Sequence, residues 1–183
     1  MKKELSIHIL STIVLFIPIF ILKFFNFSHP INSLIFWPFW LGGLIGAILP
    51  DIDHVIYVYY LRPYEVTSQR VMYQAQKGNL MASWNLLAST RSERTNLILH
   101  TILFQVIFVV LSFWVVTSSP SIFGRGLVLA FLLHLLLDEV MDLRSIGNLT
   151  AWFRNLPVQF DQMQLNIYLI TNFVIILIFG FLM

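Results

Sequence analysis

Long apolar stretches alternate with polar segments along this chain, and their lengths predict helices that cross a membrane. A helix rises about 1.5 Å per residue, so about 20 apolar residues span a hydrocarbon layer of about 30 Å. Five stretches reach or approach that length, at residues 5–25, 31–49, 97–116, 122–141 and 165–183. Backbone groups have no water to bond inside a bilayer, so each stretch is expected to be helical. The pattern predicts an all-α membrane helix bundle with about five transmembrane helices.

The polar segment at residues 55–95 has a different pattern, because apolar and polar residues alternate within it. Val71 and Leu87, for example, alternate with Arg70 and Lys77, and the segment is rich in tyrosine. Tyrosine favours the headgroup level of a membrane, so we expect helices that lie along the surface. They would act either as a lid over a site or as a surface anchor. No repeat divides residues 1–183, which we interpret as a single integral membrane domain.

Glycines in the second apolar stretch predict close helix packing. Gly42 and Gly46 are four residues apart, so they share one helix face on which another helix can approach closely. This face leads directly into Pro50 and Asp51.

Composition supports a membrane environment and excludes several functional classes. Hydrophobic residues make up 58% of the 183 residues and charged residues only 11%, which is more apolar side chain than a soluble core of this size buries. The chain has no cysteine, so disulfide scaffolds and thiolate metal sites are excluded. The net charge of +2 comes without a cluster of lysine and arginine, which argues against nucleic acid as a partner. Membrane lipids are the expected partners, and nothing in the sequence indicates an oligomeric state.

The basic residues predict the orientation. With five spans, the N-terminus, the polar segment at residues 55–95 and the loop at residues 142–164 lie on the same side of the membrane. This side holds nine of the eleven lysines and arginines: Lys2, Lys3, Arg62, Arg70, Lys77, Arg91, Arg94, Arg144 and Arg154. By the positive-inside rule this side is cytoplasmic, with the N-terminus inside and the C-terminus outside.

Chemically active side chains gather at the same predicted side, from four different apolar stretches. They are His8 in the first stretch, Asp51, Asp53 and His54 after the second, His100 in the third, and His134 with Asp138 in the fourth. His29, in an opposite-side turn, is the one histidine left out. Ionisable residues at membrane depth are costly, so such a layer is a candidate functional site.

Spacing within the helices favours a metal site. His134 and Asp138 are four residues apart, which places both on one helix face where they can share an ion. Asp51 and His54 can also converge, whereas Asp53 points elsewhere unless the backbone there is irregular. Imidazole and carboxylate without thiolate suit one or two divalent ions, zinc first, with iron or manganese as alternatives.

Each of these residues also has a purely structural interpretation. His8 could anchor its helix at the interface, Asp51 could cap a helix, and His134 with Asp138 could be a hydrogen-bonded pair that joins two helices. Their co-location favours the metal site, because independent anchors would be spread over both faces.

The sequence Leu49-Pro50-Asp51-Ile52-Asp53-His54, followed by His100-Thr101 and by the HxxxD element from His134 to Asp138, resembles a known family. The family is that of the LexA-regulated, membrane-bound, metal-dependent hydrolases of the bacterial inner membrane, and the resemblance covers approximately residues 5–142. It implies metal ligation by Asp51, Asp53, His54, His100, His134 and Asp138, with His8 as an addition. The ligand pattern is also similar to that of zinc-dependent phospholipases C.

Together these observations favour a membrane-embedded metal-dependent hydrolase that acts on an ester or phosphoester of a lipid or lipid-linked substrate at the cytoplasmic interface. Asp51, Asp53 and Asp138 are its candidate catalytic carboxylates. Two alternatives remain: a non-catalytic protein that binds or transports a metal ion, and a structural membrane scaffold. Transport is the weaker one, because transporters place ionisable residues near the midplane and the predicted midplanes are almost wholly apolar.

Overall fold

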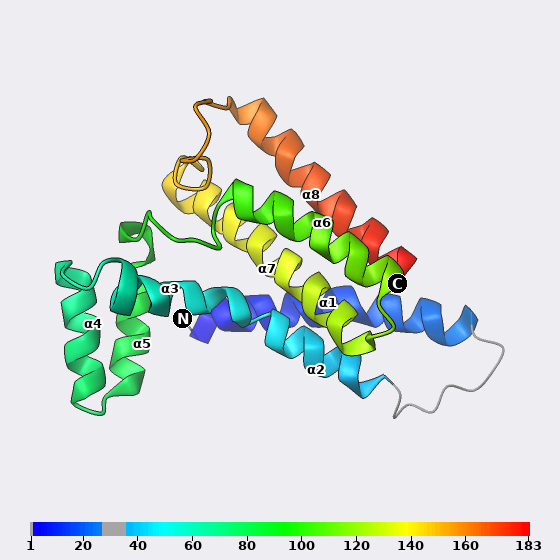
Figure 1. Ribbon diagram of the computed structural model, residues 1–183, viewed down its shortest axis with the longest axis horizontal. Helices are drawn as coiled ribbons and strands as arrows, with labels where there is room; N and C mark the ends of the chain where they lie inside the picture. Colours follow the sequence, from blue (N-terminus) through cyan, green and yellow to red (C-terminus); the bar gives the residue numbers. More distant parts are fainter. Residues whose placement is uncertain (1, 27–35) are drawn as a thin grey trace.

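The computed structural model describes residues 2–26 and 36–183, and every element in these ranges is helical, as predicted (Figure 1). The long helices are α1 (Lys2–Asn26), α2 (Trp37–Gly46), α6 (Ile102–Ser118), α7 (Ile122–Ile146) and α8 (Gln162–Leu182). The shorter ones are η2 (Leu49–Asp51), α3 (Ile52–Ile56), η3 (Tyr57–Leu61), α4 (Val66–Gln76), α5 (Leu80–Ser89) and η4 (Arg91–Glu93). The predicted turn at residues 26–30, with His29, lies almost wholly outside the described residues.

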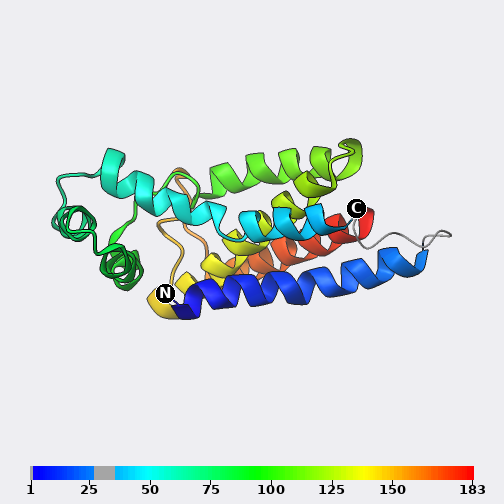
Figure 2. The ribbon, with the colours of Figure 1, turned by 90° about the horizontal axis from the view of Figure 1, so that it is seen from below.

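Helix α7 is the central element of the bundle. It contacts α1, α2, α6 and α8, and residues 128–136 are buried without interruption. Figure 2 shows α7 between α6 and α1, with the N-terminus and the C-terminus toward opposite ends of the molecule. Side chains on the outer faces of α1, α6 and α8 are apolar and exposed, as with Leu10, Val110 and Ile170. This arrangement is typical of a bundle whose surrounding solvent is lipid.

Glycine contacts hold α2 against α7, as the spacing of Gly42 and Gly46 predicts. A Cβ atom at Gly42 would overlap the backbone oxygen of Phe123, and one at Gly46 would overlap that of Leu127. Gly126 of α7 meets the backbone oxygen of Phe39 in the same way. The two backbones therefore touch directly, which fixes α2 beside the first half of α7.

Within the described residues, three helical segments are long and apolar enough to cross a membrane: Leu5–Lys23, Trp37–Leu61 and Gln162–Leu182. The second continues through η2, α3 and η3, whereas the sequence interpretation ended it at Leu49. Pro50 does not stop it, because proline lacks only a backbone donor that the first turn of η2 does not use. α6 is a shorter apolar helix, and α7 runs beside it.

The third apolar stretch is helical only from Ile102 onward. The Thr101 side chain accepts a hydrogen bond from the Phe104 amide and caps α6, so His100 lies in the non-helical segment before this helix. The sequence interpretation placed His100 inside the helix. α7 ends at Ile146, and Gly147 follows it with a φ of 80°, which suits a glycine after a helix.

The polar segment forms the expected helices, α4 and α5, which pack against each other as a hairpin. Figure 1 shows the hairpin at one end of the molecule, running across the direction of the long helices. A small second core of Val58, Val71 and Leu87 joins the hairpin to η3. Tyr60 and Tyr64 are strongly exposed beside it, as expected for an interfacial segment.

A cluster of buried polar side chains, which the sequence analysis did not consider, joins α6, α7 and α8. The Tyr168 hydroxyl contacts both Glu139 and Gln105, and the Gln105 side-chain amide donates to Glu139 at 3.3 Å. Glu139 is fully buried. These contacts tie the three helices together at a depth where an unpaired polar group would be costly.

Candidate metal centre

The Asp138 carboxylate contacts three histidines from separate parts of the chain. Its Oδ1 lies 3.2 Å from Nε2 of His8, and its Oδ2 lies 2.9 Å from Nε2 of His100 and 3.3 Å from Nε2 of His134. All four side chains are buried. α1 supplies His8, α7 supplies His134 and Asp138, and the segment before α6 supplies His100. The predicted layer is therefore a cluster with Asp138 at its centre.

The separations in this cluster match those of ligands around one ion. Metal–nitrogen bonds of about 2.0–2.1 Å in tetrahedral geometry place neighbouring ligand atoms about 3.3 Å apart. Donor atoms of His8, His134 and Asp138 all lie within 4.8 Å of one another, so this trio could hold a metal ion. Asp51 Oδ1 lies 3.7 Å from Nε2 of His134 and is a fourth ligand candidate.

Hydrogen bonding fixes the His134 ring in the tautomer that a metal requires. Nδ1 lies 2.6 Å from the carbonyl oxygen of Ala47, which can only accept, so Nδ1 carries the proton. Nε2 therefore presents a lone pair, and it has no hydrogen-bond partner within the described ranges. The His8 ring stacks on the His134 ring at 3.9 Å between centroids. A backbone bond at one nitrogen and a free second nitrogen is the usual arrangement of a ligating histidine.

Asp53 acts on the cluster through His100. Its buried carboxylate accepts hydrogen bonds from the backbone amides of Ile98 at 3.1 Å, Leu99 at 2.6 Å and His100 at 3.3 Å. The same carboxylate lies 3.1 Å from Nδ1 of His100, so it turns Nε2 of that ring toward Asp138. Asp51 and His54 line the small cavity together and Asp53 does not, in agreement with the spacing. Asp53 has the position of a carboxylate that orients a ligating histidine.

His54 has a different partner from the other histidines. Its Nδ1 accepts a hydrogen bond from Nε of Arg94 at 3.1 Å, so a neutral ring carries its proton on Nε2. This arrangement leaves no ring lone pair for a metal, and ligation by His54 requires the Arg94 bond to break. Burial lowers the pKa of Arg94 to about 10, and Arg94 is still charged at neutral pH because this value lies well above 7.

Arg91 belongs to the cluster, although the sequence analysis used it only as an indicator of orientation. Its Nη1 lies 2.8 Å from Oδ1 of Asp138, and its Nε lies 3.4 Å from Oδ1 of Asp142. Burial opposes the charge, but Asp138 and Asp142 raise the pKa of Arg91 above its ordinary value. The sequence shows Arg91 shortly before His100, but its partner Asp138 is 47 residues away and is brought near only by the fold.

A family model described as YdjM inner membrane protein matches residues 4–181. The chain belongs to this family. The match agrees with the membrane part of the resemblance to the LexA-regulated proteins, and with the apolar helices it supports an integral inner membrane protein. No curated protein and no solved structure matches the chain.

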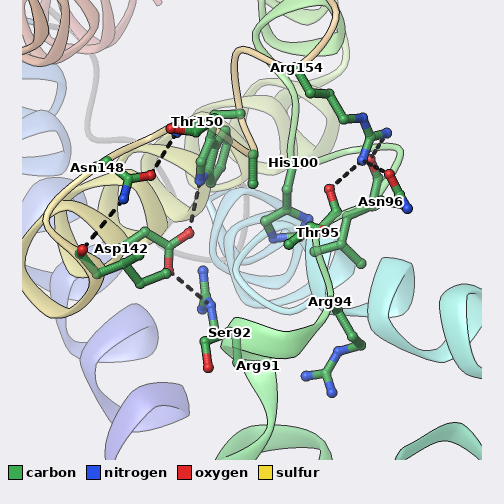
Figure 3. Close-up of a pocket in the computed structure, with 14 residues that line it drawn as sticks. Arg91, Ser92, Arg94, Thr95, Asn96, His100, Asp142, Asn148, Thr150 and Arg154 are labelled. Atoms are coloured by element: carbon green, nitrogen blue, oxygen red, sulfur yellow. Dashed lines mark hydrogen bonds and ion pairs between the residues drawn. The ribbon is translucent and has the colours of Figure 1, made fainter. Parts of the chain in front are cut away.

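Two cavities adjoin the cluster. The smaller has a volume of about 40 Å³, and His8, Asp51 and His54 line it together with Trp84 and Leu87 of α5. Helix α5 thus forms part of the wall of this cavity. The larger cavity, of about 310 Å³, lies between the segment around residues 91–97 and the loop around residues 146–154 and reaches His100 (Figure 3).

Arg91 and Arg94 line both cavities. A cavity of 40 Å³ has room for one or two water molecules and not for an organic substrate, whereas 310 Å³ lies at the lower end of the range for ligand sites.

Proposed function

We propose that this protein is a metal-dependent hydrolase that cleaves an ester or phosphoester of a lipid or lipid-linked substrate at the cytoplasmic face of the inner membrane. The proposal places the N-terminus in the cytoplasm and the C-terminus outside. The observation that carries it is the convergence of three histidine Nε2 atoms on Asp138, at 2.9–3.3 Å.

The donor set supports a resident cation. His134 presents a buried nitrogen lone pair, and Asp138 is a fully buried carboxylate between three imidazoles. The Arg91 guanidinium compensates the charge of Asp138 in part, and the buried lone pair of His134 still needs a proton or a metal. Nitrogen and carboxylate ligands without thiolate suit zinc, with manganese or iron as alternatives, and the number of candidate ligands allows one or two ions.

Each residue has a role in the proposed reaction. His8, His134 and Asp138 would hold the ion, with Asp51 and His100 completing its surroundings, and Asp53 would keep His100 oriented. A bound divalent ion lowers the pKa of water and stabilises negative charge on an ester oxygen. Asp51 lines the small cavity and has a side chain that is 22% exposed, so it is placed to accept a proton from a water molecule there.

The position of the site supports a lipid substrate. Trp84 and Leu87 of α5 line the small cavity with His8 and Asp51, and Figure 1 shows the α4–α5 hairpin at the end of the long helices. Exposed tyrosines of this region are suited to the headgroup level. Headgroups are the molecules that such a site meets first. The predicted excess of lysine and arginine on this side supports a cytoplasmic location.

Hydrolysis in a defined membrane tests the proposal. The purified protein is reconstituted in phospholipid nanodiscs, and release of a water-soluble phosphate or alcohol product is followed before chelation, after chelation and after zinc is restored. We expect the wild type to turn over substrate, chelation to abolish this turnover and added zinc to restore it. We expect no turnover by His134→Ala.

Asp161→Asn is the matched control, because Asp161 caps α8 away from the cluster and asparagine caps equally well. Metal binding without turnover of ester or phosphoester substrates would contradict hydrolysis and support the non-catalytic alternative.

A further inference from the structure

Three arginines line the larger cavity, and two of them donate hydrogen bonds from both Nη atoms to other groups of the protein. Arg94 donates from Nε to His54, from Nη1 to Thr90 at 3.0 Å and from Nη2 to the carbonyl oxygen of Leu87. Arg154 donates from Nη1 to the carbonyl oxygen of Thr95 and from Nη2 to that of Leu97, each at 2.6 Å. These two arginines therefore tie backbone segments together.

Arg91 differs from both. Its Nη1 and Nε are held by Asp138 and Asp142, while its Nη2 is buried and has no hydrogen-bond partner in the described part of the chain. A buried charged donor without a partner is costly, and native proteins rarely retain one. Since two carboxylates fix the guanidinium plane, Nη2 is also fixed in place. It is a preorganised donor for a further acceptor.

The place of Arg91 indicates where this acceptor would come from. Arg91 lines both the small cavity, beside His8 and Asp51, and the larger one, beside His100. Figure 3 shows the Arg91 side chain directed toward Asp142 and that of Arg94 directed away from it. A substrate in the larger cavity therefore meets Arg91 where that cavity adjoins the metal ligands.

We propose that Arg91 binds the phosphoryl group of the substrate, so that the substrate is a phosphoester and not a carboxylic ester. This inference rests on the proposed function and narrows its substrate class. Guanidinium groups match the oxygens of a tetrahedral phosphate, whereas a neutral carboxylic ester needs no fixed cation. The cavity offers Asn96, Asn148 and Thr150 as polar contacts for the rest of a headgroup.

Charge balance adds a condition to the proposal. Asp138 and Asp142 lie against Arg91, so its positive charge is partly compensated. An anion is then attracted fully only when a metal ion adds its own charge to the cluster. Phosphate binding should therefore depend on both Arg91 and the metal.

The test measures binding of inorganic phosphate by calorimetry, without any turnover. The full-length protein is kept in a maltoside detergent, which contains no phosphate, and the metal content of every sample is measured. We expect the metal-loaded wild type to bind phosphate, and Arg91→Gln to weaken that binding by about 10- to 100-fold. Arg144→Gln, which removes an exposed charge at the same end of α7, should change it by less than about twofold.

A second variant covers loss of folding or of metal. Arg91→Lys keeps a charge beside Asp138 but lacks the forked donor, so it should keep its metal and still bind phosphate more weakly. Short-chain phosphatidic acid, added to the same detergent, identifies the source of the group: tighter binding than inorganic phosphate indicates a lipid headgroup, and equal binding indicates a soluble phosphate.

Wild-type affinity in both Arg91 variants, at equal metal content, would overturn the proposal. So would a wild type that hydrolyses carboxylic esters and does not bind phosphate. Phosphate binding that requires Arg91, in a protein that hydrolyses nothing, would instead support the phosphoryl site and refute the hydrolase.

Discussion

Replacing Asp53 by asparagine tests how the candidate metal centre is supported. The carboxylate of Asp53 accepts hydrogen bonds from the three backbone amides of residues 98–100 and faces Nδ1 of His100. Asparagine can keep its oxygen toward Leu99 and His100, but it must then turn its NH2 group toward the amide of Ile98. Two donors face each other in that arrangement, and the remaining bonds lose their ionic character.

The size of the effect follows from these contacts. A buried donor left unsatisfied costs about 1–3 kcal/mol, and hydrogen bonds to a neutral oxygen are about half as strong as those to a carboxylate. We expect Asp53→Asn to lower the free energy of unfolding by on the order of 3 kcal/mol. Because the hydrogen bond that orients His100 loses its ionic character, metal affinity should fall by about 10- to 100-fold.

Thermal denaturation in detergent with and without chelator measures the first quantity, and competition with a metal indicator measures the second. Asp161→Asn is again the control, and its melting temperature should stay at the wild-type value. An Asp53→Asn variant that binds metal with wild-type affinity would refute the orienting role of Asp53. An unchanged melting temperature would refute the energetic importance of its hydrogen bonds.

Two further substitutions test the packing that positions the site. Gly46→Val would overlap the backbone oxygen of Leu127 and force α2 away from α7, so we expect a loss of about 1–3 kcal/mol in the free energy of unfolding and reduced metal content. Gly124→Ala is the control and should melt like the wild type, because its Cβ would meet only side-chain atoms of Ser121 and Val115, at 3.3–3.5 Å. Trp152→Phe removes the 2.8 Å hydrogen bond from the indole to Asp142, which should cost about 1.5–3 kcal/mol in thermal denaturation, and unchanged stability would contradict this contribution.

The parts of the structure that sequence could predict are those that depend on local spacing. The apolar lengths predicted helices, and the Gly42 and Gly46 face predicted a close helix contact, although only the fold shows that α7 is the partner. His134 and Asp138 share a face because they are four residues apart on one helix. Helix periodicity also separates Asp53 from Asp51 and His54, which line the small cavity without it.

The remaining features depend on how distant segments pack. Hydrophobicity continues through His100, so the sequence alone places it in a helix, whereas the Thr101 cap and the Asp53 carboxylate hold residues 98–100 outside α6. The Arg91 pair with Asp138 and the Arg94 bond to His54 join segments about 40 or more residues apart. No local pattern identifies such partners.

The most direct test of a metal centre at Asp138 is the metal content of the purified protein, measured by elemental analysis on the wild type, His134→Ala and Asp161→Asn. We predict at least one zinc, manganese or iron ion per chain in the wild type and in Asp161→Asn, and its loss in His134→Ala. A wild type that contains no such ion after purification with zinc present, or a His134→Ala variant that contains as much metal as the wild type, would contradict the metal centre.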